Sequence, residues 1–310
     1  MHAPALIALD WGTSSFRAYL LSGEGEILEQ ISRPQGIITV APGQFETVFE
    51  DAVGHWLAAH QSLPVIASGM VGSRQGWMEV PYAPCPAGTQ ELTAGLTLLQ
   101  TAKGRRLWLV PGLRYEDTDG IPDVIRGEEV QLVGAGEGGQ MRDGVYVFPG
   151  THSKWAVVEG GRIVWFATFM TGEMFSLLRQ HSILGRPMTD GPEDAAAFRK
   201  GVEGGLSNSG LLNRLFSVRT YSLFGMMPDS SLSSYLSGLL IGAEIAEARQ
   251  RLGQRQAISA LTVVGGAKLA PRYVQALEHA GLTARAVGEE ATVRGLFHIA
   301  RTAELCVTAG

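Results

Sequence analysis

Two short turns rich in glycine, serine and threonine are the residues of this sequence best suited to bind phosphate. Residues 12–15 read Gly-Thr-Ser-Ser, and residues 150–153 read Gly-Thr-His-Ser. Turns of this composition expose backbone N–H groups with no bulky side chain in the way, so that these donors can surround phosphate oxygens. Two such turns facing each other would hold a polyphosphate. The predicted phosphate ligands are the following members of the turns: Gly12, Thr13, Ser14, Gly150 and Thr151.

A carboxylate and a guanidinium flank the first turn. Asp10 ends the apolar run before the turn and could hold hydrated Mg²⁺, an ion that prefers one or two carboxylates together with water and phosphate ligands. Arg17 lies on the strand that leaves the turn and could place its donors against a phosphate. An Asp10 that only caps the turn and an Arg17 that is only exposed on its strand remain open alternatives.

Residues 126–129 read Arg-Gly-Glu-Glu and place two carboxylates at a boundary between a loop and a helix. Either Glu128 or Glu129 could accept the proton of an attacking hydroxyl group. Paired glutamates at a helix start are also favourable through the helix dipole alone. Elsewhere, Arg74 follows a loop punctuated by glycines and could bind a substrate carboxylate, although such an arginine commonly faces solvent.

Several well-known motifs are missing from the sequence. No lysine follows a glycine, which excludes the phosphate-binding pattern GxxxxGK[ST]. Residues 134–139 match GxGxxG, but they follow a predicted helix and no helix clearly follows them, so we interpret them as linker rather than as a dinucleotide site. The pattern HExxH is absent, and the seven histidines show no metal-ligand spacing.

The composition indicates a compact enzyme with two domains. The chain has 310 residues, of which 45% are apolar and 18% charged, and this length suits two cores with a cleft between them. A net charge of -5 argues against nucleic-acid binding, and the two cysteines favour a reducing compartment. The sequence starts without a basic segment of a signal peptide and contains no helix apolar enough for a membrane, so we expect a cytoplasmic location.

The Gly-Thr-x-Ser turn recurs about half a chain apart, each time within a pattern of strand, turn, strand, turn and strand. This recurrence predicts a duplication, whereas the alternative is two ordinary hairpins. Residues 136–139 are the predicted linker, which divides the chain into domains 1–138 and 139–310. Whether the last segment, residues 291–305, packs on the second domain or returns to the first is left open.

Further elements follow from hydrophobic periodicity. The predicted helices span residues 45–59, 174–184, 192–203, 233–252 and 271–280, and a helix also follows the loop within residues 124–136. The predicted strands span residues 64–67, 107–110 and 261–264. Gly265 and Gly266 stand between the last strand and a helix, an arrangement suited to a nucleotide. The tryptophans Trp11, Trp77 and Trp155 could line a cleft or pack in a core.

Three of these segments together resemble the sugar-kinase, Hsp70 and actin superfamily. Residues 9–17 look like its first phosphate motif, residues 150–153 like its second, and residues 263–268 like its adenosine motif, in the right order along nearly the whole chain. The resemblance implies an α/β, two-domain actin-like ATPase fold of the ribonuclease H type, with duplicated mixed sheets flanked by helices and an interdomain nucleotide cleft. It also implies ATP as a substrate and adenosine contacts from Gly265 and Gly266.

Residues 68–74, 126–129 and 149–155 resemble, more specifically, the 2-dehydro-3-deoxygalactonokinase family. This resemblance implies transfer of the γ-phosphoryl group of ATP, with Mg²⁺, to the C6 hydroxyl of 2-dehydro-3-deoxy-D-galactonate in galactonate breakdown. Related carbohydrate kinases place a catalytic aspartate after a glycine before the second phosphate motif. Glu128 occupies the corresponding place and is the implied base, but the change from Asp to Glu leaves room for Glu129.

The same resemblance implies a pocket for a small sugar acid. Arg74 is the implied partner of the substrate carboxylate, with Ser73 and Arg126 as further substrate-binding residues, and Asp10 holds the metal ion through water. Two rival functions remain: a kinase of the same fold with another sugar or sugar acid, and an ATP-binding regulatory module that transfers no phosphate. A homo-oligomer is compatible with the sequence but is not indicated by it.

Overall fold

The chain forms two compact units in the computed structural model, which describes residues 3–207, 210–253, 260–288 and 290–306. Unit 1 comprises Met1–Asp143, Val157–Phe166 and Glu289–Gly310, and unit 2 comprises Gly144–Ala156 and Ala167–Gly288. The sequence predicted a division at residue 138, whereas unit 1 continues to Asp143 and also includes Val157–Phe166. Residues 291–305, whose position the sequence left open, belong to unit 1.

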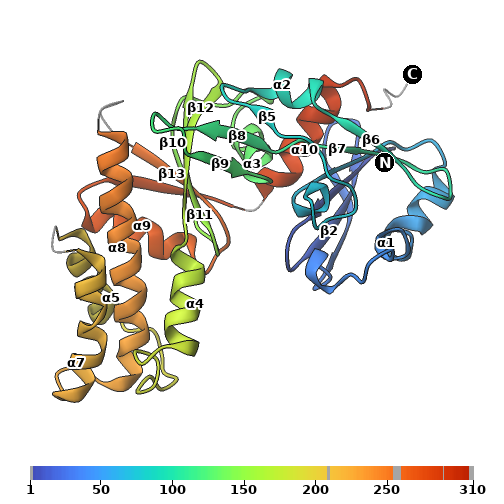
Figure 1. Ribbon diagram of the computed structural model, residues 1–310. Coiled ribbons are helices and arrows are strands. Elements are labelled where there is room, and N and C mark those ends of the chain that lie inside the picture. The colour runs from blue at the N-terminus through green and yellow to red at the C-terminus, as the bar shows by residue number, and fades with distance from the viewer. Residues whose placement is uncertain (1–2, 208–209, 254–259, 289, 307–310) are drawn as a thin grey trace. The chain divides into compact units, whose positions relative to one another are not determined.

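Unit 1 is built on a mixed sheet (Figure 1). The sheet has six strands in the order β3-β2-β1-β4-β7-β6. The strands β1 and β4 pair in parallel, as do β4 and β7, whereas β2, β3 and β6 join the sheet in antiparallel pairs. The strands are β1 (Pro4–Trp11), β2 (Phe16–Ser22), β3 (Ile27–Arg33), β4 (Val65–Ser68), β6 (Thr97–Gln100) and β7 (Arg106–Leu109).

Both faces of β1 are buried, which explains its continuous run of apolar residues. Because side chains alternate along a strand, Ile7, Leu9 and Trp11 share one face and pack in a core with α1 (Phe45–Ala59). The other face of the strand carries Leu6 and Ala8, and α10 (Glu290–Thr302) packs against β1. This position of α10 answers the question that the sequence left open.

Glycines allow α10 to approach α3 (Glu128–Ala135) closely in unit 1. A Cβ atom on Gly134 would collide with the carbonyl oxygen of Ala291, and one on Gly295 with that of Val130. Gly134 therefore serves helix packing, and Gly134 and Ala135 belong to α3 rather than to a linker as the sequence predicted. The remaining elements of the unit are η1 (Ile37–Thr39), η2 (Met70–Gly72), α2 (Thr89–Ala94) and a small sheet of β5 (Ala83–Pro84), β8 (Leu113–Glu116) and β9 (Pro122–Ile125).

The second large sheet has the order β12-β11-β10-β13-β14, with β10, β13 and β14 in parallel. Its topology repeats that of β3-β2-β1-β4-β7 in unit 1, and the two Gly-Thr-x-Ser turns occupy equivalent places, between β1 and β2 and between β10 and β11. The strands are β10 (Gly144–Phe148), β11 (Ser153–Glu159), β12 (Arg162–Phe169), β13 (Ala260–Val264) and β14 (Thr283–Val287).

The helices of unit 2 include a tightly packed pair, α5 and α8, which lie side by side (Figure 1). Glycines at the crossing, Gly201 and Gly238 among them, leave no room for a Cβ atom, so the two backbones approach closely. The helices are α4 (Thr171–His181), α5 (Ala195–Leu206), α6 (Leu211–Leu215), α7 (Ser217–Leu223), α8 (Leu232–Leu252) and α9 (Ala270–His279), with η3 (Asp229–Ser231) before α8. The helices α4 and α5 are shifted by three residues from their predicted bounds.

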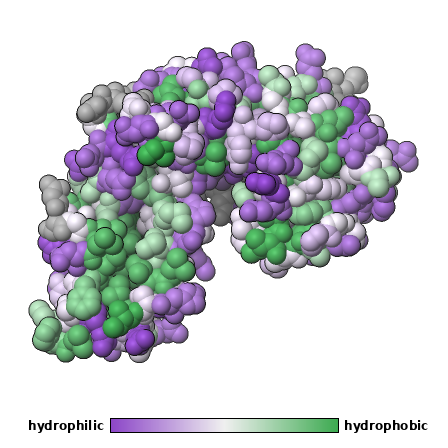
Figure 2. Space-filling model, in the orientation of Figure 1, coloured by the Kyte–Doolittle hydropathy of each residue, from purple (hydrophilic) through white to green (hydrophobic). Residues whose placement is uncertain are grey.

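The three tryptophans Trp11, Trp77 and Trp155 pack against other side chains. Trp11 and Trp155 are fully buried, and Trp77 contacts Trp11, Phe45 and Phe49 in an aromatic cluster. Apolar surface is found instead over the helices of unit 2 (Figure 2). Its most exposed large side chains are Leu212, Phe216, Leu223, Phe224 and Met226. Among the described residues, no helix has the length and apolar character needed to cross a membrane.

Candidate active site

The first glycine-rich turn is anchored through its backbone and leaves its hydroxyl groups exposed. The Gly12 N–H donates to the Ser15 carbonyl at 2.9 Å, and the carbonyls of Gly12 and Thr13 accept from Ile37 and Ile38. Thr13 and Ser14 are exposed. Backbone hydrogen bonds thus fix the turn, and the side chains of Thr13 and Ser14 are accessible to a ligand.

Asp10 lies at the carboxyl end of β1, directly before this turn, and its side chain is 19% exposed. Its Oδ2 atom is 3.3 Å from Nη1 of Arg17, so these two predicted site residues contact each other. The parallel register places Asp10 opposite Ser68, the last residue of β4. A phosphate role for Arg17 stays a prediction, and its contact shows that it also orients Asp10.

Two glycines bring the Arg-Gly-Glu-Glu segment next to Asp10. Gly69 has a φ of 90°, a left-handed conformation that favours glycine, and a Cβ there would lie 2.9 Å from the Trp11 carbonyl oxygen and 3.6 Å from Oδ1 of Asp10. A Cβ on Gly127 would in turn lie 3.8 Å from the Cα of Gly69. The metal candidate and the base candidates therefore lie in one region of unit 1.

The two glutamates at the start of α3 differ in burial. The Glu128 side chain is half-buried, and its Oε2 accepts the Arg126 backbone N–H at 3.0 Å. Glu129 is fully buried, and both its carboxyl oxygens lie 2.8 Å from the Gly127 nitrogen. Burial, reinforced by the charge of Glu128, raises the pKa of the Glu129 carboxyl to about 8. Two neighbouring carboxyl groups with such different surroundings are typical of an acid–base site.

Two buried polar side chains in this region have atoms without a hydrogen-bond partner among the described residues. The Arg126 side chain is only 9% exposed; its Nη2 donates to the Val80 carbonyl at 2.8 Å, and its guanidinium carbon lies 4.3 Å from the centroid of the Tyr82 ring. Its Nε and Nη1 atoms lack partners, as does Oγ of Ser68. Buried polar groups are normally hydrogen-bonded, so these atoms indicate a place for a ligand.

The other predicted substrate residues have different environments. Ser73 is buried, and its hydroxyl donates to the Met70 carbonyl at 2.7 Å, whereas Arg74 is exposed. Sequence reasoning did not find Ser68. The signal that could have found it is its place directly after the strand predicted at residues 64–67 and before Gly69.

The second glycine-rich turn lies against the start of α4 in unit 2. A Cβ on Gly172 would collide with the Gly150 carbonyl oxygen, and the Glu173 N–H donates to the Thr151 carbonyl at 2.9 Å. His152 contacts the Glu173 carboxylate, with 2.6 Å between Nε2 and Oε2. The turn is therefore fixed by the first turn of a helix.

The predicted adenosine glycines lie in the same unit as the second turn. A Cβ on Gly265 would be 3.5 Å from Cδ of Pro149, the residue before that turn. The Gly265 N–H donates to the Val287 carbonyl, and the Gly266 carbonyl accepts from Leu269 and Ala270 at the start of α9. The structure thus brings the two motifs together within unit 2, and the adenosine role of Gly265 and Gly266 stays a prediction.

A buried carboxylate that the sequence did not reveal ties this region together. Glu244 of α8 accepts from Oγ of Ser153, Nε1 of Trp155 and Oη of Tyr273, each at 2.7 Å. Thr171 at the start of α4 also hydrogen-bonds to it. Burial raises the pKa of the Glu244 carboxyl, and these four donors oppose that effect by favouring the charged form.

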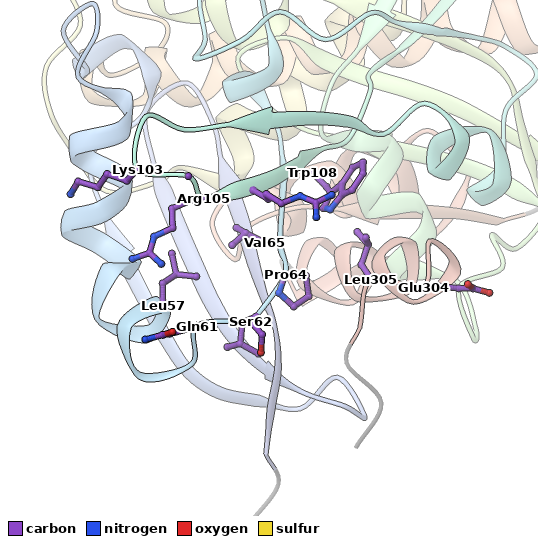
Figure 3. Close-up of a pocket in the computed structure, with 13 residues that line it drawn as sticks. Leu57, Gln61, Ser62, Pro64, Val65, Lys103, Arg105, Trp108, Glu304 and Leu305 are labelled. Atoms are coloured by element: carbon purple, nitrogen blue, oxygen red, sulfur yellow. The ribbon is translucent and has the colours of Figure 1, made fainter. Parts of the chain in front are cut away.

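A separate pocket of about 450 Å³ opens in unit 1 (Figure 3). It includes Val65 and Arg106, the first residues of β4 and β7, whereas Asp10 and Ser68 are at the carboxyl ends of their strands. Since β1, β4 and β7 are parallel, this pocket is at the opposite edge of the sheet from Asp10. Ligands of open α/β sheets bind outside the carboxyl ends, so this pocket is not the candidate active site.

The described residues contain no group of three or more His, Cys, Asp or Glu side chains that could hold a metal ion. This fits Mg²⁺ bound together with phosphates, because such an ion keeps several waters and needs only one or two protein carboxylates. Asp10, partly exposed beside the glycine turn, is a suitable carboxylate.

Comparisons with known proteins agree on one family. The family model described as 2-keto-3-deoxy-galactonokinase matches residues 10–299. The chain is 37% identical to the 2-dehydro-3-deoxygalactonokinase of Escherichia coli (strain K12) over 295 residues, which is 95% of this chain and 97% of that protein. It is 38% identical over 301 residues to a protein of Rhizobium meliloti (strain 1021) named a probable 2-dehydro-3-deoxygalactonokinase, with 95% and 96% of the two chains covered.

A solved structure extends the comparison to the fold. A crystal structure of a Sinorhizobium meliloti protein, provisionally assigned as a 2-dehydro-3-deoxygalactonokinase, superimposes with a TM-score of 0.83 at 37% identity, covering 96% of each chain. The family predicted from the sequence and the two-domain actin-like fold class are both confirmed.

Proposed function

Because this chain belongs to the 2-keto-3-deoxy-galactonokinase family, we propose that it transfers the γ-phosphoryl group of ATP to the C6 hydroxyl of 2-dehydro-3-deoxy-D-galactonate. The observation that carries the proposal is the meeting of Asp10 and the Gly127–Glu128 segment around Gly69 in unit 1. The carboxylate of Asp10, which can bind a metal ion, thereby lies near the carboxylate of Glu128, which can accept a proton. These are the two protein groups that phosphoryl transfer to an alcohol requires.

Glu128 is the proposed base. It orients the C6 hydroxyl and takes its proton as the oxygen forms a bond to the γ-phosphorus and the bond between that phosphorus and the β,γ-bridging oxygen of ATP breaks. Its half-buried side chain supports this role, because a substrate hydroxyl can reach it. Glu129, fully buried and folded back on the Gly127 N–H, is the alternative base and otherwise acts on Glu128 through its charge state.

The phosphate groups of ATP are proposed to bind to the two glycine-rich turns. Gly12, Thr13 and Ser14 supply donors from the first turn, with Arg17 behind Asp10, and Gly150 and Thr151 supply donors from the second. The adenosine is proposed to rest on Gly265 and Gly266. Asp10 would hold Mg²⁺ through water, and the bound ion would supply positive charge against the phosphates.

The sugar acid is proposed to bind beside Glu128, in a pocket that includes Ser73, Arg74 and Arg126. Support comes from the short loop around η2: a Cβ on Gly72 would lie 2.9 Å from Nη1 of Arg126, so Arg126 lies against the segment that leads to Ser73 and Arg74. A cytoplasmic location and a homo-oligomer stay predictions from the sequence.

The test of the proposed function is a coupled assay of ADP release. Mg-ATP is supplied with 2-dehydro-3-deoxy-D-galactonate, its gluconate epimer, galactonate, glycerol or no acceptor. We expect the galactonate-derived keto acid to give the highest kcat/KM. Turnover with another acceptor would replace the substrate and keep the mechanism, whereas ATP binding without acceptor-dependent ADP would favour a regulatory module.

A further inference from the structure

The geometry points to Arg126 as the residue that binds the carboxylate of the acceptor, in preference to the exposed Arg74. This inference rests on the proposed function and deepens it, because it identifies the group that distinguishes a sugar acid from a neutral sugar.

Arg126 is a buried cation whose hydrogen bonding is incomplete. Nη2 donates to the Val80 carbonyl and the guanidinium carbon lies over the Tyr82 ring, but Nε and Nη1 have no partner among the described residues. An isolated charge taken out of water costs several kcal/mol unless it is paired and hydrogen-bonded. A carboxylate would supply both the opposite charge and two acceptor oxygens.

The acidic groups near Arg126 do not replace such a ligand. Glu128 accepts from the backbone N–H of Arg126, and Glu129 points its two oxygens at the Gly127 N–H. Arg126 lowers the pKa of Glu129, but burial and the charge of Glu128 outweigh it and leave Glu129 largely protonated at neutral pH. The positive charge of the guanidinium is therefore available to an incoming anion.

The local backbone also makes room for the guanidinium. A Cβ at position 72 would lie only 2.9 Å from Nη1 of Arg126 and 3.3 Å from the side chain of Val80. Glycine at this position lets the arginine lie against η2, the short 3₁₀ helix that leads to Ser73 and Arg74. The site is thus built around Arg126, whereas Arg74 is exposed and its charge is already solvated.

The orphaned hydroxyl of Ser68 indicates that the same ligand extends toward Asp10. Ser68 is buried, its Oγ has no partner among the described residues, and it stands opposite Asp10 in the β1–β4 register. A sugar acid that places its carboxylate at Arg126 can therefore also hydrogen-bond to the Ser68 hydroxyl, beside Asp10.

The experiment compares Arg126→Met with Arg74→Met, and uses Arg114→Met on the exposed face of β8 as the matched control. We measure KM for the keto acid, KM for ATP, and the shift in Tm that galactonate and ATP each produce without turnover. A hydrogen-bonded charge pair contributes about 1.5–3 kcal/mol, so Arg126→Met should raise KM for the acid by about 10- to 100-fold. It should also abolish the galactonate shift and retain the ATP shift.

Arg114→Met should match the wild type, and Arg74→Met should raise KM for the acid by about threefold at most, as expected for an exposed ion pair of ≤ ~0.7 kcal/mol. Arg126→Lys keeps the positive charge and serves as a second variant in case Arg126→Met fails to fold. It should weaken binding of the acid while its Tm without ligand stays near the wild-type value.

A KM for the acid within threefold of wild type in both Arg126 variants, with the galactonate shift retained, would overturn the inference. A large effect at Arg74 alone would also overturn it. If the wild type shows no turnover with the keto acid, the proposed function fails instead, and an Arg126-dependent Tm shift with galactonate would still support the carboxylate site.

Discussion

Two buried polar clusters, one in each unit, have their hydrogen bonds satisfied to very different degrees. In unit 2, the Glu244 carboxylate receives hydrogen bonds from Ser153, Trp155, Tyr273 and Thr171. In unit 1, Oγ of Ser68 and two nitrogens of Arg126 have no partner among the described residues, and Glu129 is buried beside another carboxylate. Both regions adjoin a glycine-rich turn, so proximity to the turn does not explain the difference.

The difference follows from what each region has to hold. A fully satisfied buried network fixes the backbone around it, and Glu244 connects β11, α8, α9 and the start of α4 in this way. An incompletely satisfied group keeps its hydrogen-bonding capacity for a ligand. The comparison therefore supports the proposed binding site for the sugar acid in unit 1 and indicates a structural role for the Glu244 network in unit 2.

The largest expected effect comes from Glu128→Gln. The amide cannot accept the proton of the substrate hydroxyl, and general base catalysis contributes about 10²- to 10⁴-fold, so kcat should fall by that factor while the affinity for ATP changes little. The measurements are steady-state kinetics and ATP binding by calorimetry.

Glu129→Gln is the matched variant for this prediction, since it changes the neighbouring carboxyl at the same helix start. We expect a smaller fall in kcat for Glu129→Gln than for Glu128→Gln. The reverse order would transfer the role of the base to Glu129 and would show that a fully buried carboxyl in unit 1 can meet the substrate.

The sequence predicted this site unevenly. Asp10 and the turn after it could be found because a buried apolar run ends at a carboxylate and a run of small residues, a local pattern. Glu128 and Glu129 were predicted as a pair of candidate bases, and the resemblance to the family ranked Glu128 first. The actin-like fold and the family could be predicted because three motifs in a fixed order constrain the whole chain. Both predictions are confirmed.

The parts that escaped prediction depend on contacts between distant segments. Ser68 is one serine at the end of a strand, and only the pairing of β4 with β1 places it opposite Asp10. Glu244 lies in an apolar helix, and its partners Ser153 and Tyr273 are 91 and 29 residues away along the chain. The start of α4 was missed because Thr171 and Gly172 resemble a turn, whereas the helix begins there against the second glycine-rich turn.

The Glu244 network gives the second prediction, which concerns stability. Glu244→Gln replaces an acceptor oxygen with an NH₂ group that cannot accept from its present donor, leaving a buried donor unsatisfied at a cost of about 1–3 kcal/mol. The free energy of unfolding, measured with urea, should fall by that amount. Glu247→Gln, which removes an exposed partner of Arg251 on the same helix, should cost at most about 0.5 kcal/mol.

Equal losses for Glu244→Gln and Glu247→Gln would contradict the assignment of Glu244 as a buried structural centre. The Glu244 network could then no longer be contrasted with the unsatisfied groups of unit 1. A loss confined to Glu244→Gln would support it.

The third prediction uses the pH dependence of stability to test whether the buried Glu129 carboxyl is protonated in the folded protein. In the unfolded chain the Glu129 carboxyl has its ordinary pKa of 4.5, and in the folded protein burial raises that pKa to about 8. Between these values the folded state binds the proton and the unfolded state does not. The contribution of Glu129 to the free energy of unfolding is therefore fully present below pH 4.5 and is lost as the pH rises to about 8.

Glu129→Gln should remove this dependence, because an amide has no proton to lose. Urea unfolding at intervals from about pH 5 to about pH 8 should show the wild type losing stability relative to the variant, by no more than about 1.4 kcal/mol per pH unit. Glu116→Gln, at the exposed end of β8, is the control and should follow the wild type. Parallel curves for wild type and Glu129→Gln would mean that Glu129 is already ionised in the folded protein. Arg126 would then have an anionic neighbour, and the case for an acceptor carboxylate at Arg126 would weaken accordingly.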